Sequence, residues 1–468
     1  MASAIDDSGA PPPAVARYEG LDRDIWSMAW PAMLSLCVVN IVDVIDVALV
    51  GRLGRQTVAA WGYSTQCTNL VETLIQSVGI GCVALVARAR GAGDSERARR
   101  ILAASVVVSV SVAAMLFALV LVAPRFLLRL LDAEPAVIEI AVPYFRIFAG
   151  AMLLYGAAFM YESSLRAHRN TRTPMVIALF VMGTKTVMSL LLVFGALGFP
   201  RLELVGAGMA TACAHAVGLA LYVFTCRRAA RDGLDVTFGW KELRGLYRTA
   251  KEVLSVAIPS MGERLIMSLA LLTYFRVLST YGTAAIAAYA IGVRLLSFSW
   301  VPGLGFAAAA STIVGQSLGA GDSEQARLAG RRAVGQAVLV MCVLGSIFFF
   351  LRAPLAHAFA SDGRVAENLM PFMMMLAISQ PFMGAHFTLG GVLRGAGDTL
   401  TPLFGAAVGN WGFRVPLAWL FSRILGVGLV WVWAALIADH FARMLVNGVV
   451  FLRGRWSMRT GASVGGRS

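Results

Sequence analysis

Long apolar stretches, separated by short polar segments, run along almost the whole chain. The residues from Ile101 to Pro124 carry no charge, and neither do those from Val334 to Leu351. About 20 consecutive apolar residues are enough to cross the hydrocarbon core of a bilayer as a helix. A membrane β-barrel has shorter segments, of about 10 residues with alternating polarity, and the sequence lacks that pattern. The chain is therefore predicted to be an all-α integral membrane protein.

The apolar windows predict twelve transmembrane helices in two groups of six. The first six cover 25–50, 57–87, 99–124, 136–164, 174–198 and 203–226, and the second six cover 252–279, 284–316, 330–351, 366–392, 402–422 and 427–452. We thus expect an N-terminal bundle over 25–226, a linker over 227–251 and a C-terminal bundle over 252–452. The acidic, proline-containing residues 1–24 and residues 453–468 are expected to be cytoplasmic tails, the first of them disordered.

The two groups of helices repeat each other in sequence. GAGDSERAR at 91–99 recurs as GAGDSEQAR at 319–327, an offset of 228 residues. The same offset relates Pro31 to Pro259 and Arg166 to Arg394. Because each copy holds six helices, both copies begin on the same side of the membrane. The repeat therefore predicts pseudo-two-fold symmetry along the membrane normal.

Composition and charge agree with a membrane protein. The 468 residues are 58% hydrophobic and 14% charged, with a net charge of +14, whereas a soluble domain carries about 25% charged residues. The segments expected on the side of the termini contain 25 Lys and Arg residues, against 8 on the other side. The positive-inside rule then places both termini in the cytoplasm and explains the basic charge without nucleic acid.

Two carboxylates lie in the second half of the first predicted helix. Asp43 and Asp46 are three residues apart on one helix face, and Asn40 lies one turn earlier. A charge at the centre of a membrane helix costs roughly 2.5–3.5 kcal/mol, so two neighbouring carboxylates should not both be ionised freely. This arrangement suits a proton carrier, or a cage for a metal cation. A static, paired anchor for the helix is the alternative.

Several segments together resemble the multidrug and toxic compound extrusion (MATE) family, most closely its bacterial DinF-like branch. They are PAMLSLCVVNIVDVIDVALVGRLG at 31–54, VPGLGFAAAASTIVGQSLGAGD at 301–322, QPFMGAHFTLGGVLRGAGDTLTP at 380–402 and NWGFRVPLA at 410–418. The resemblance covers nearly the whole chain after residue 25. It implies export of drugs or metabolites, driven by the inward flow of protons or sodium ions.

The resemblance also indicates which residues couple transport to an ion. Asp46 matches the family's functional aspartate, and Thr211 in GMATA matches a threonine near that site. Lys185 stands where the family usually has asparagine, and Ser189 where some members have aspartate. Both departures weaken a sodium site in this half. Lys185 is interpreted as a built-in cation near Asp43 and Asp46, or else as a residue that snorkels or pairs with Glu162.

In the second half, charged and bulky residues are candidates for a substrate cleft between the bundles. They are Glu263, Met267, Tyr289, Arg294, Phe298 and Trp300. Aromatic and methionine side chains suit bulky organic cations, although packing explains each of them singly. Some family members carry a glutamate one turn further along this helix, where this chain has Met267. Glu263 therefore matches that position only approximately. Asp439 and Arg443, four residues apart, are expected to pair with each other.

The sequence thus predicts a monomeric antiporter of the bacterial inner membrane. It would export organic, cationic or amphipathic compounds in exchange for protons, with sodium as the alternative ion and no other cofactor. A flippase for lipid-linked sugars and a major-facilitator porter are rival transporters. An enzyme is disfavoured because the five histidines lack metal-ligand spacing and no nucleophile elbow is present.

Overall fold

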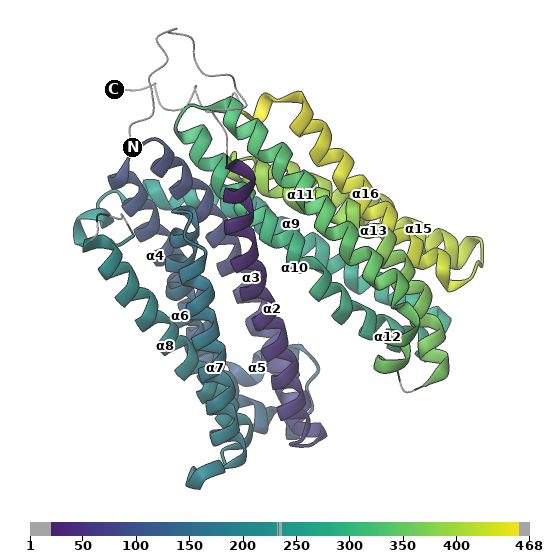
Figure 1. The fold of residues 1–468 in the computed structure, drawn as a ribbon. Coiled ribbons are helices and arrows are strands. Elements are labelled where there is room, and N and C mark those ends of the chain that lie inside the picture. Colours follow the sequence, from purple (N-terminus) through teal and green to yellow (C-terminus); the bar gives the residue numbers. More distant parts are fainter. Residues whose placement is uncertain (1–19, 232, 234–235, 361, 458–468) are drawn as a thin grey trace.

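The computed structural model describes residues 20–231, 233, 236–360 and 362–457. The first half forms one bundle, the N bundle, shown in purple to teal in Figure 1. Its spans are α2 (Leu21–Gly51), α3 (Arg55–Gly91), α4 (Ser95–Val122), α6 (Pro135–Ala167), α7 (Arg172–Phe194) and α8 (Glu203–Arg231). The short helix α5 (Pro124–Leu130) connects α4 to α6.

The second half forms the C bundle, shown in green to yellow in Figure 1. Its spans are α9 (Leu246–Leu278), α10 (Thr283–Gly319), α11 (Ser323–Phe350), α13 (Gly363–Gly395), the helix Leu400–Ile424, and α16 (Leu429–Arg453), with α12 (Arg352–Phe359) between α11 and α13. The helix Leu400–Ile424 alternates between α-helix, in α14 (Leu400–Ala407) and α15 (Val415–Trp419), and π-helix, in η4 (Val408–Arg414) and η5 (Leu420–Ile424).

The twelve predicted spans are confirmed. Ten of the described helices are long and apolar enough to cross a membrane, and α13 and Leu400–Ile424 complete the two sets of six. Several helices extend past their predicted ends: α8 continues to Arg231 and α9 begins at Leu246, so the connection between the bundles is shorter than the predicted linker. Polar residues at these ends remain helical because a helix can project beyond the bilayer into water.

The repeated GAGD segments form equivalent turns in the two bundles. Gly93 and Gly321 have positive φ angles of 73° and 81°, which L-residues with a Cβ adopt only with strain. Asp94 then caps α4 by accepting from the backbone N–H of Arg97 at 2.9 Å, and Asp322 caps α11 by accepting from that of Gln325 at 2.8 Å. The two copies thus form the same connector, a glycine turn followed by an aspartate cap.

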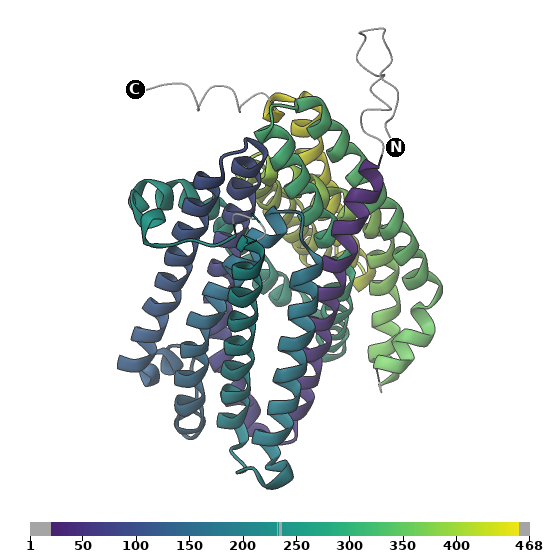
Figure 2. The ribbon, with the colours of Figure 1, turned by 60° about the vertical axis from the view of Figure 1, so that its left-hand side comes forward.

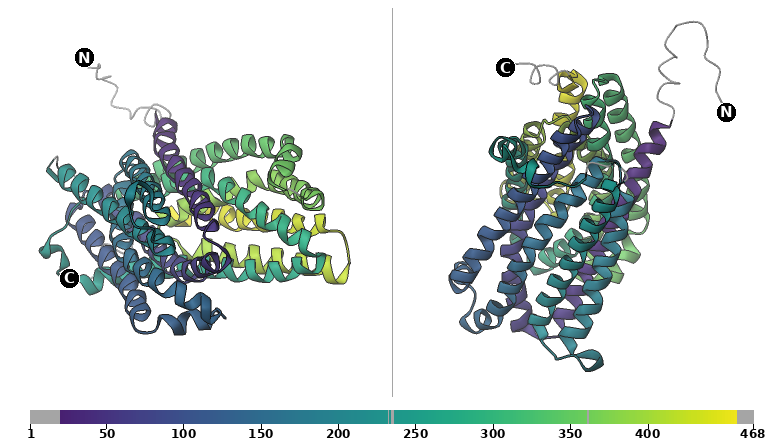
Figure 3. Two further views of the ribbon diagram at one scale, coloured as in Figure 1. Left: turned by 90° about the horizontal axis from the view of Figure 1, so that it is seen from below. Right: turned by 90° about the vertical axis from the view of Figure 1, so that its left-hand side faces the viewer.

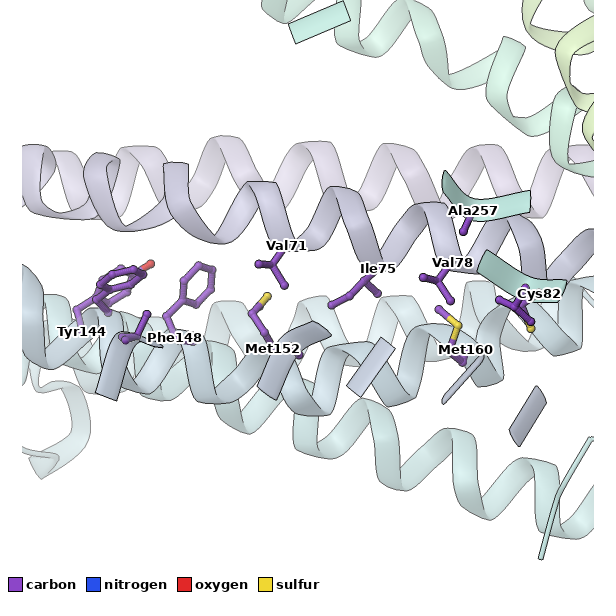
Figure 4. Close-up of a cluster of buried hydrophobic side chains, with 14 of the residues drawn as sticks. Val71, Ile75, Val78, Cys82, Tyr144, Phe148, Met152, Met160 and Ala257 are labelled. Atoms are coloured by element: carbon purple, nitrogen blue, oxygen red, sulfur yellow. The ribbon is translucent and has the colours of Figure 1, made fainter. Parts of the chain in front are cut away.

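Each bundle has its own apolar core. Figure 4 shows α3 side chains, among them Val71, Ile75 and Val78, facing Phe148 and Met152 of α6. The first helix of the C bundle also contributes to this core, since Val253 and Ala257 of α9 belong to the same cluster. Helix α9 therefore packs directly on α3.

The bundles approach each other at the end where α2 begins and α16 ends, and they diverge toward the opposite end (Figures 1 and 2). Seen along the bundles, α2 lies at their junction (Figure 3, left). Polar contacts cross the junction at the closed end: Gln316 of α10 donates to the Ala167 carbonyl at 2.7 Å, and Arg169 donates to the Gln316 side chain at 2.6 Å. On the pseudo-symmetric side, Arg88 of α3 donates to the Ala396 carbonyl.

Candidate functional site

An ion pair joins α2 to α7 within the N bundle. Lys185 Nζ of α7 lies 2.5 Å from Asp46 Oδ2 of α2, and the two side chains are only 16% and 15% exposed. Away from water the attraction between the two charges is stronger than on a surface. Removing the charges from water, however, also costs more hydration free energy. The interpretation of Lys185 as a cation beside the α2 carboxylates agrees with this geometry. Its alternative partner, Glu162, instead pairs with Arg166.

Asp43 lies one turn before Asp46 and is exposed. The Asp43 carboxylate interacts electrostatically with Lys185 and Asp46. Among the described residues, neither Asp43 nor Asn40 forms a side-chain hydrogen bond. The site thus holds two carboxylates and one ammonium. Asp43, Asp46 and Lys185 together carry one negative charge when both aspartates are ionised, which leaves one position among these three residues where a proton can be taken up.

Thr211 and Ser189, the other positions implied by the family resemblance, are both buried. The Thr211 hydroxyl donates to the Ala207 carbonyl of its own helix at 3.1 Å. Its hydroxyl is therefore engaged locally, as for a packing residue. A role for Thr211 in ion binding stays a prediction.

A third carboxylate and several aromatic groups extend this polar region. Glu72 of α3 lies within electrostatic range of Asp43 and Lys185. The Tyr144 hydroxyl lies near Asp46 and Glu72, and His215 lies near Lys185. His215 also contacts the Tyr155 ring at 5.3 Å between centroids. The sequence analysis assigned no role to Glu72, Tyr144, Tyr155 or His215. The signal in the sequence that could have identified these residues was a polar side chain inside an apolar span.

The middle of the C bundle contains a different, more basic cluster. Asp439 of α16 is fully buried and accepts two hydrogen bonds from Arg443, at 2.6 and 3.1 Å. Arg414 lies 3.7 Å from the same carboxylate, and its guanidinium stacks over the Tyr274 ring. The predicted pair of Asp439 and Arg443 is confirmed. With two guanidinium groups and one carboxylate, the cluster carries an excess positive charge.

Tyr289 belongs to this cluster and not to a cleft, contrary to our expectation. Its side chain is fully buried. Its ring stacks on Trp433 with centroids 5.6 Å apart, and its hydroxyl accepts a hydrogen bond from Arg414 at 3.1 Å. An apolar helix face looks the same in the sequence whether it faces a cleft, lipid or its own bundle. Met267 also lies beside the cluster, with its sulfur 3.6 Å from Arg443.

The remaining cleft candidates are not brought together. Glu263 of α9 forms an ion pair with Arg394 of α13, in which one guanidinium nitrogen is 2.7 Å from both carboxylate oxygens. Arg294 is exposed on α10. Phe298 is half-buried, and Trp300, also half-buried, contacts the Phe387 ring edge to face. A role for Arg294, Phe298 and Trp300 in substrate binding stays a prediction.

Two of the five histidines meet in the C bundle, although their spacing in the sequence gave no sign of it. His386 Nε2 of α13 lies 3.0 Å from His440 Nδ1 of α16, and the rings stack. Within the described ranges, no group of three or more His, Cys, Asp or Glu side chains could hold a metal ion. The histidine pair is therefore a polar contact between helices.

The MatE family model matches both halves of the chain, over residues 31–191 and 259–420. "Probable multidrug resistance protein NorM" of Thermotoga maritima is 25% identical over 437 residues, which are 93% of this chain and 93% of that protein. The protein of the same name from Deinococcus radiodurans is 27% identical and spans 97% and 98% of the two chains. The chain belongs to the MatE family. It is a multi-pass membrane transporter, as the sequence predicted, and not an enzyme.

Solved structures of MATE transporters have the same fold. The Vibrio cholerae transporter VcmN in its bent form superimposes with a TM-score of 0.88 at 21% identity, over 95% of this chain and 99% of that one. The outward-facing conformation of a multidrug resistance MATE transporter gives a TM-score of 0.85 at 22% identity, over 94% and 96%. This likeness confirms two bundles of six helices.

Proposed function

We propose that the chain is a secondary antiporter that exports organic compounds in exchange for protons. The observation that carries the proposal is the partly buried ion pair of Asp46 and Lys185, one helical turn from the second carboxylate, Asp43. Lys185 can compensate only one negative charge, so the two carboxylates together can take up one proton, and we assign that proton to Asp46. Family membership and the multidrug resistance relatives support the export of organic compounds.

The same ion pair favours protons over sodium ions. A sodium ion bound between α2 and α7 would approach the fixed ammonium of Lys185 and would meet its repulsion. Ser189, one turn further along α7, offers no carboxylate to offset that repulsion. A proton needs no such cage, because it binds a carboxylate oxygen covalently.

Uptake of the proton would change the balance between two arrangements of the bundles. Neutralising the α2 carboxylates removes the cost of placing their charge in a drier environment. Release of the proton would restore that cost and favour the other arrangement. A membrane potential adds about 2.3 kcal/mol per elementary charge per 100 mV, enough to bias such an equilibrium by more than tenfold.

We also propose that the protein works as a monomer in the bacterial inner membrane with both termini in the cytoplasm. The excess of Lys and Arg on the side of the termini supports this orientation. The end at which the bundles meet would then face the cytoplasm, and the protein would be open to the outside.

Transport in proteoliposomes tests the proposal. Purified protein would be reconstituted, and export of a fluorescent organic amine would be followed under an imposed proton gradient, an imposed sodium gradient or neither. We expect transport under the proton gradient alone. Transport under the sodium gradient alone would contradict proton coupling, and movement of a lipid-linked sugar without the amine would identify a flippase.

A further inference from the structure

The segment that connects the two bundles lies at the closed end, on the outer side of the N bundle (Figures 1 and 2). It contains the short helix η2 (Trp240–Leu243) and leads into the first turns of α9. Val236 is fully buried, and the Phe238 ring stacks on Tyr161 of α6 with centroids 6.2 Å apart. These contacts hold the segment against the N bundle. Because it joins two membrane spans, the segment lies at a membrane surface.

The carboxylates of this segment pair with arginines of α4. Glu242 lies 3.4 Å from Arg99, and it also accepts a hydrogen bond from the backbone N–H of Gly239 at 2.8 Å. Glu252, in the second turn of α9, lies 3.5 Å from Arg97. Both carboxylates therefore compensate bases of the N bundle and not the bases of their own segment.

Four basic residues of the segment are left without a counter-charge. All four are exposed, and they are Lys241, Arg244, Arg248 and Lys251. Among the residues that the structure describes, none of the four forms an ion pair or a side-chain hydrogen bond. The segment thus presents four positive charges outward, and the end of α8 adds three more exposed arginines, Arg227, Arg228 and Arg231.

Two aromatic side chains are exposed among these bases. Trp240 is 89% exposed and Tyr247 is 83% exposed. The first turns of α9 have two faces: Leu246 and Ala250 pack on the N-bundle core, whereas Tyr247 and Lys251, also four residues apart, share the outer face. Tryptophan and tyrosine, which combine an apolar ring with a polar edge, are enriched where a membrane meets water.

We propose that these exposed residues form a surface that binds the headgroups of anionic phospholipids in the leaflet at the closed end. This basic surface consists of Trp240, Lys241, Arg244, Tyr247, Arg248 and Lys251. The two rings lie at the level of the headgroups, and the guanidinium groups donate forked hydrogen bonds to lipid phosphates. Each Lys or Arg near an anionic membrane surface strengthens binding roughly fivefold. The inference is independent of the transported compound and of the coupling ion.

Quenching of tryptophan fluorescence by brominated lipids tests this inference. The full-length protein is placed in phosphatidylcholine nanodiscs that contain a small fraction of one lipid brominated close to its headgroup, either phosphatidylglycerol or phosphatidylcholine. The difference between the native protein and Trp240→Phe isolates the signal of Trp240. We expect Trp240 to report a relative binding constant at least about fivefold in favour of phosphatidylglycerol. Higher salt should reduce this preference, because it screens exposed charges.

Variants separate recognition of the charge from the position of the aromatic rings. One variant replaces all four bases of the surface by Gln: Lys241→Gln, Arg244→Gln, Arg248→Gln and Lys251→Gln. It should lose the preference for phosphatidylglycerol and keep the quenching by phosphatidylcholine, since the rings still lie at the interface. Replacing both lysines by Arg retains the charges and should retain the preference. Arg129→Gln is the control, because Arg129 is exposed on α5 at the opposite end, and its loss should leave the preference unchanged.

Several results would overturn the inference. They are equal quenching of Trp240 by the two lipids in the native protein, no quenching of Trp240 by either lipid, and an unchanged preference in the variant with four Gln substitutions. A preference that does not fall at high salt, measured on the native protein, would also overturn it. Loss of the preference on addition of inorganic phosphate at constant ionic strength would assign the surface to free phosphate instead of lipid.

Discussion

Gly91 of α3 and Gly319 of α10 are equivalent residues of the two repeats, and each packs against the backbone of the other's helix. A Cβ added to Gly91 would lie 2.0 Å from the Gln316 carbonyl oxygen, and one added to Gly319 would lie 2.1 Å from that of Arg88. Gln316 and Arg88 are themselves separated by the repeat offset. The pseudo-symmetry axis therefore passes through this contact between the bundles.

Gly91→Ala should open the closed end. The new methyl group cannot fit against backbone, so the bundles must separate there. We expect faster hydrogen–deuterium exchange in peptides covering residues 312–322, and a lower melting temperature. Gly335→Ala is the control, because a Cβ on this α11 glycine meets nothing within 4 Å; it should be neutral or slightly stabilising. Unchanged exchange in Gly91→Ala would show that the contact does not hold the bundles together.

Asp439→Asn should strongly destabilise the C bundle. The carboxylate is fully buried between Arg443 and Arg414, and its removal leaves two buried guanidinium groups without a counter-charge. Breaking a buried pair in this way costs about 3–5 kcal/mol. Thermal unfolding in detergent measures the loss. Glu139→Gln, which removes an exposed ion pair with Arg125, should unfold like the native protein, and an equal effect of both variants would refute the argument.

The orientation of the chain is open to a direct test. A reporter that is active only in the cytoplasm should be active when it is fused after residue 468 or inserted between α8 and α9, since basic residues gather at these places. The same reporter inserted at Leu197, an exposed residue of the turn between α7 and α8, should be inactive. The reverse pattern would invert the proposed topology.

The sequence was sufficient for the helices and the repeat, because the length of the apolar segments and the constant offset between matching residues determine them. It also placed Lys185 near Asp46, through the interpretation of Lys185 as a built-in cation. It failed for Tyr289 and did not foresee the contact of His386 with His440. Helices that are apolar on all sides do not reveal which face meets lipid, a cleft or a neighbouring helix. That choice depends on packing between distant segments.

Asp46→Asn should abolish coupled export while leaving insertion and substrate binding intact. The amide keeps the size and polarity of the side chain but cannot take up a proton or compensate Lys185. Asp43→Asn should reduce coupled export less than Asp46→Asn does, if Asp43 mainly affects the ionisation of Asp46. Gradient-driven transport and binding of the fluorescent amine are measured on the same preparations. Undiminished active export by Asp46→Asn would end the assignment of this residue to ion coupling.

Lys185→Asn should change which ion the protein uses. The native ammonium lies 2.5 Å from Asp46, in the space where a cation would otherwise bind, and its charge repels sodium. The substitution removes that charge and leaves an amide, the residue usual in the family, beside two carboxylates. Proton-driven export should then fall at least about tenfold, the scale of one lost charged interaction, or sodium should begin to stimulate transport.

Lys185→Arg keeps the positive charge, and export by this variant should remain independent of sodium. Initial rates under proton and sodium gradients, measured for all three proteins, decide between these outcomes. Sodium-driven export by the native protein would rule out the built-in cation, whatever the variants do.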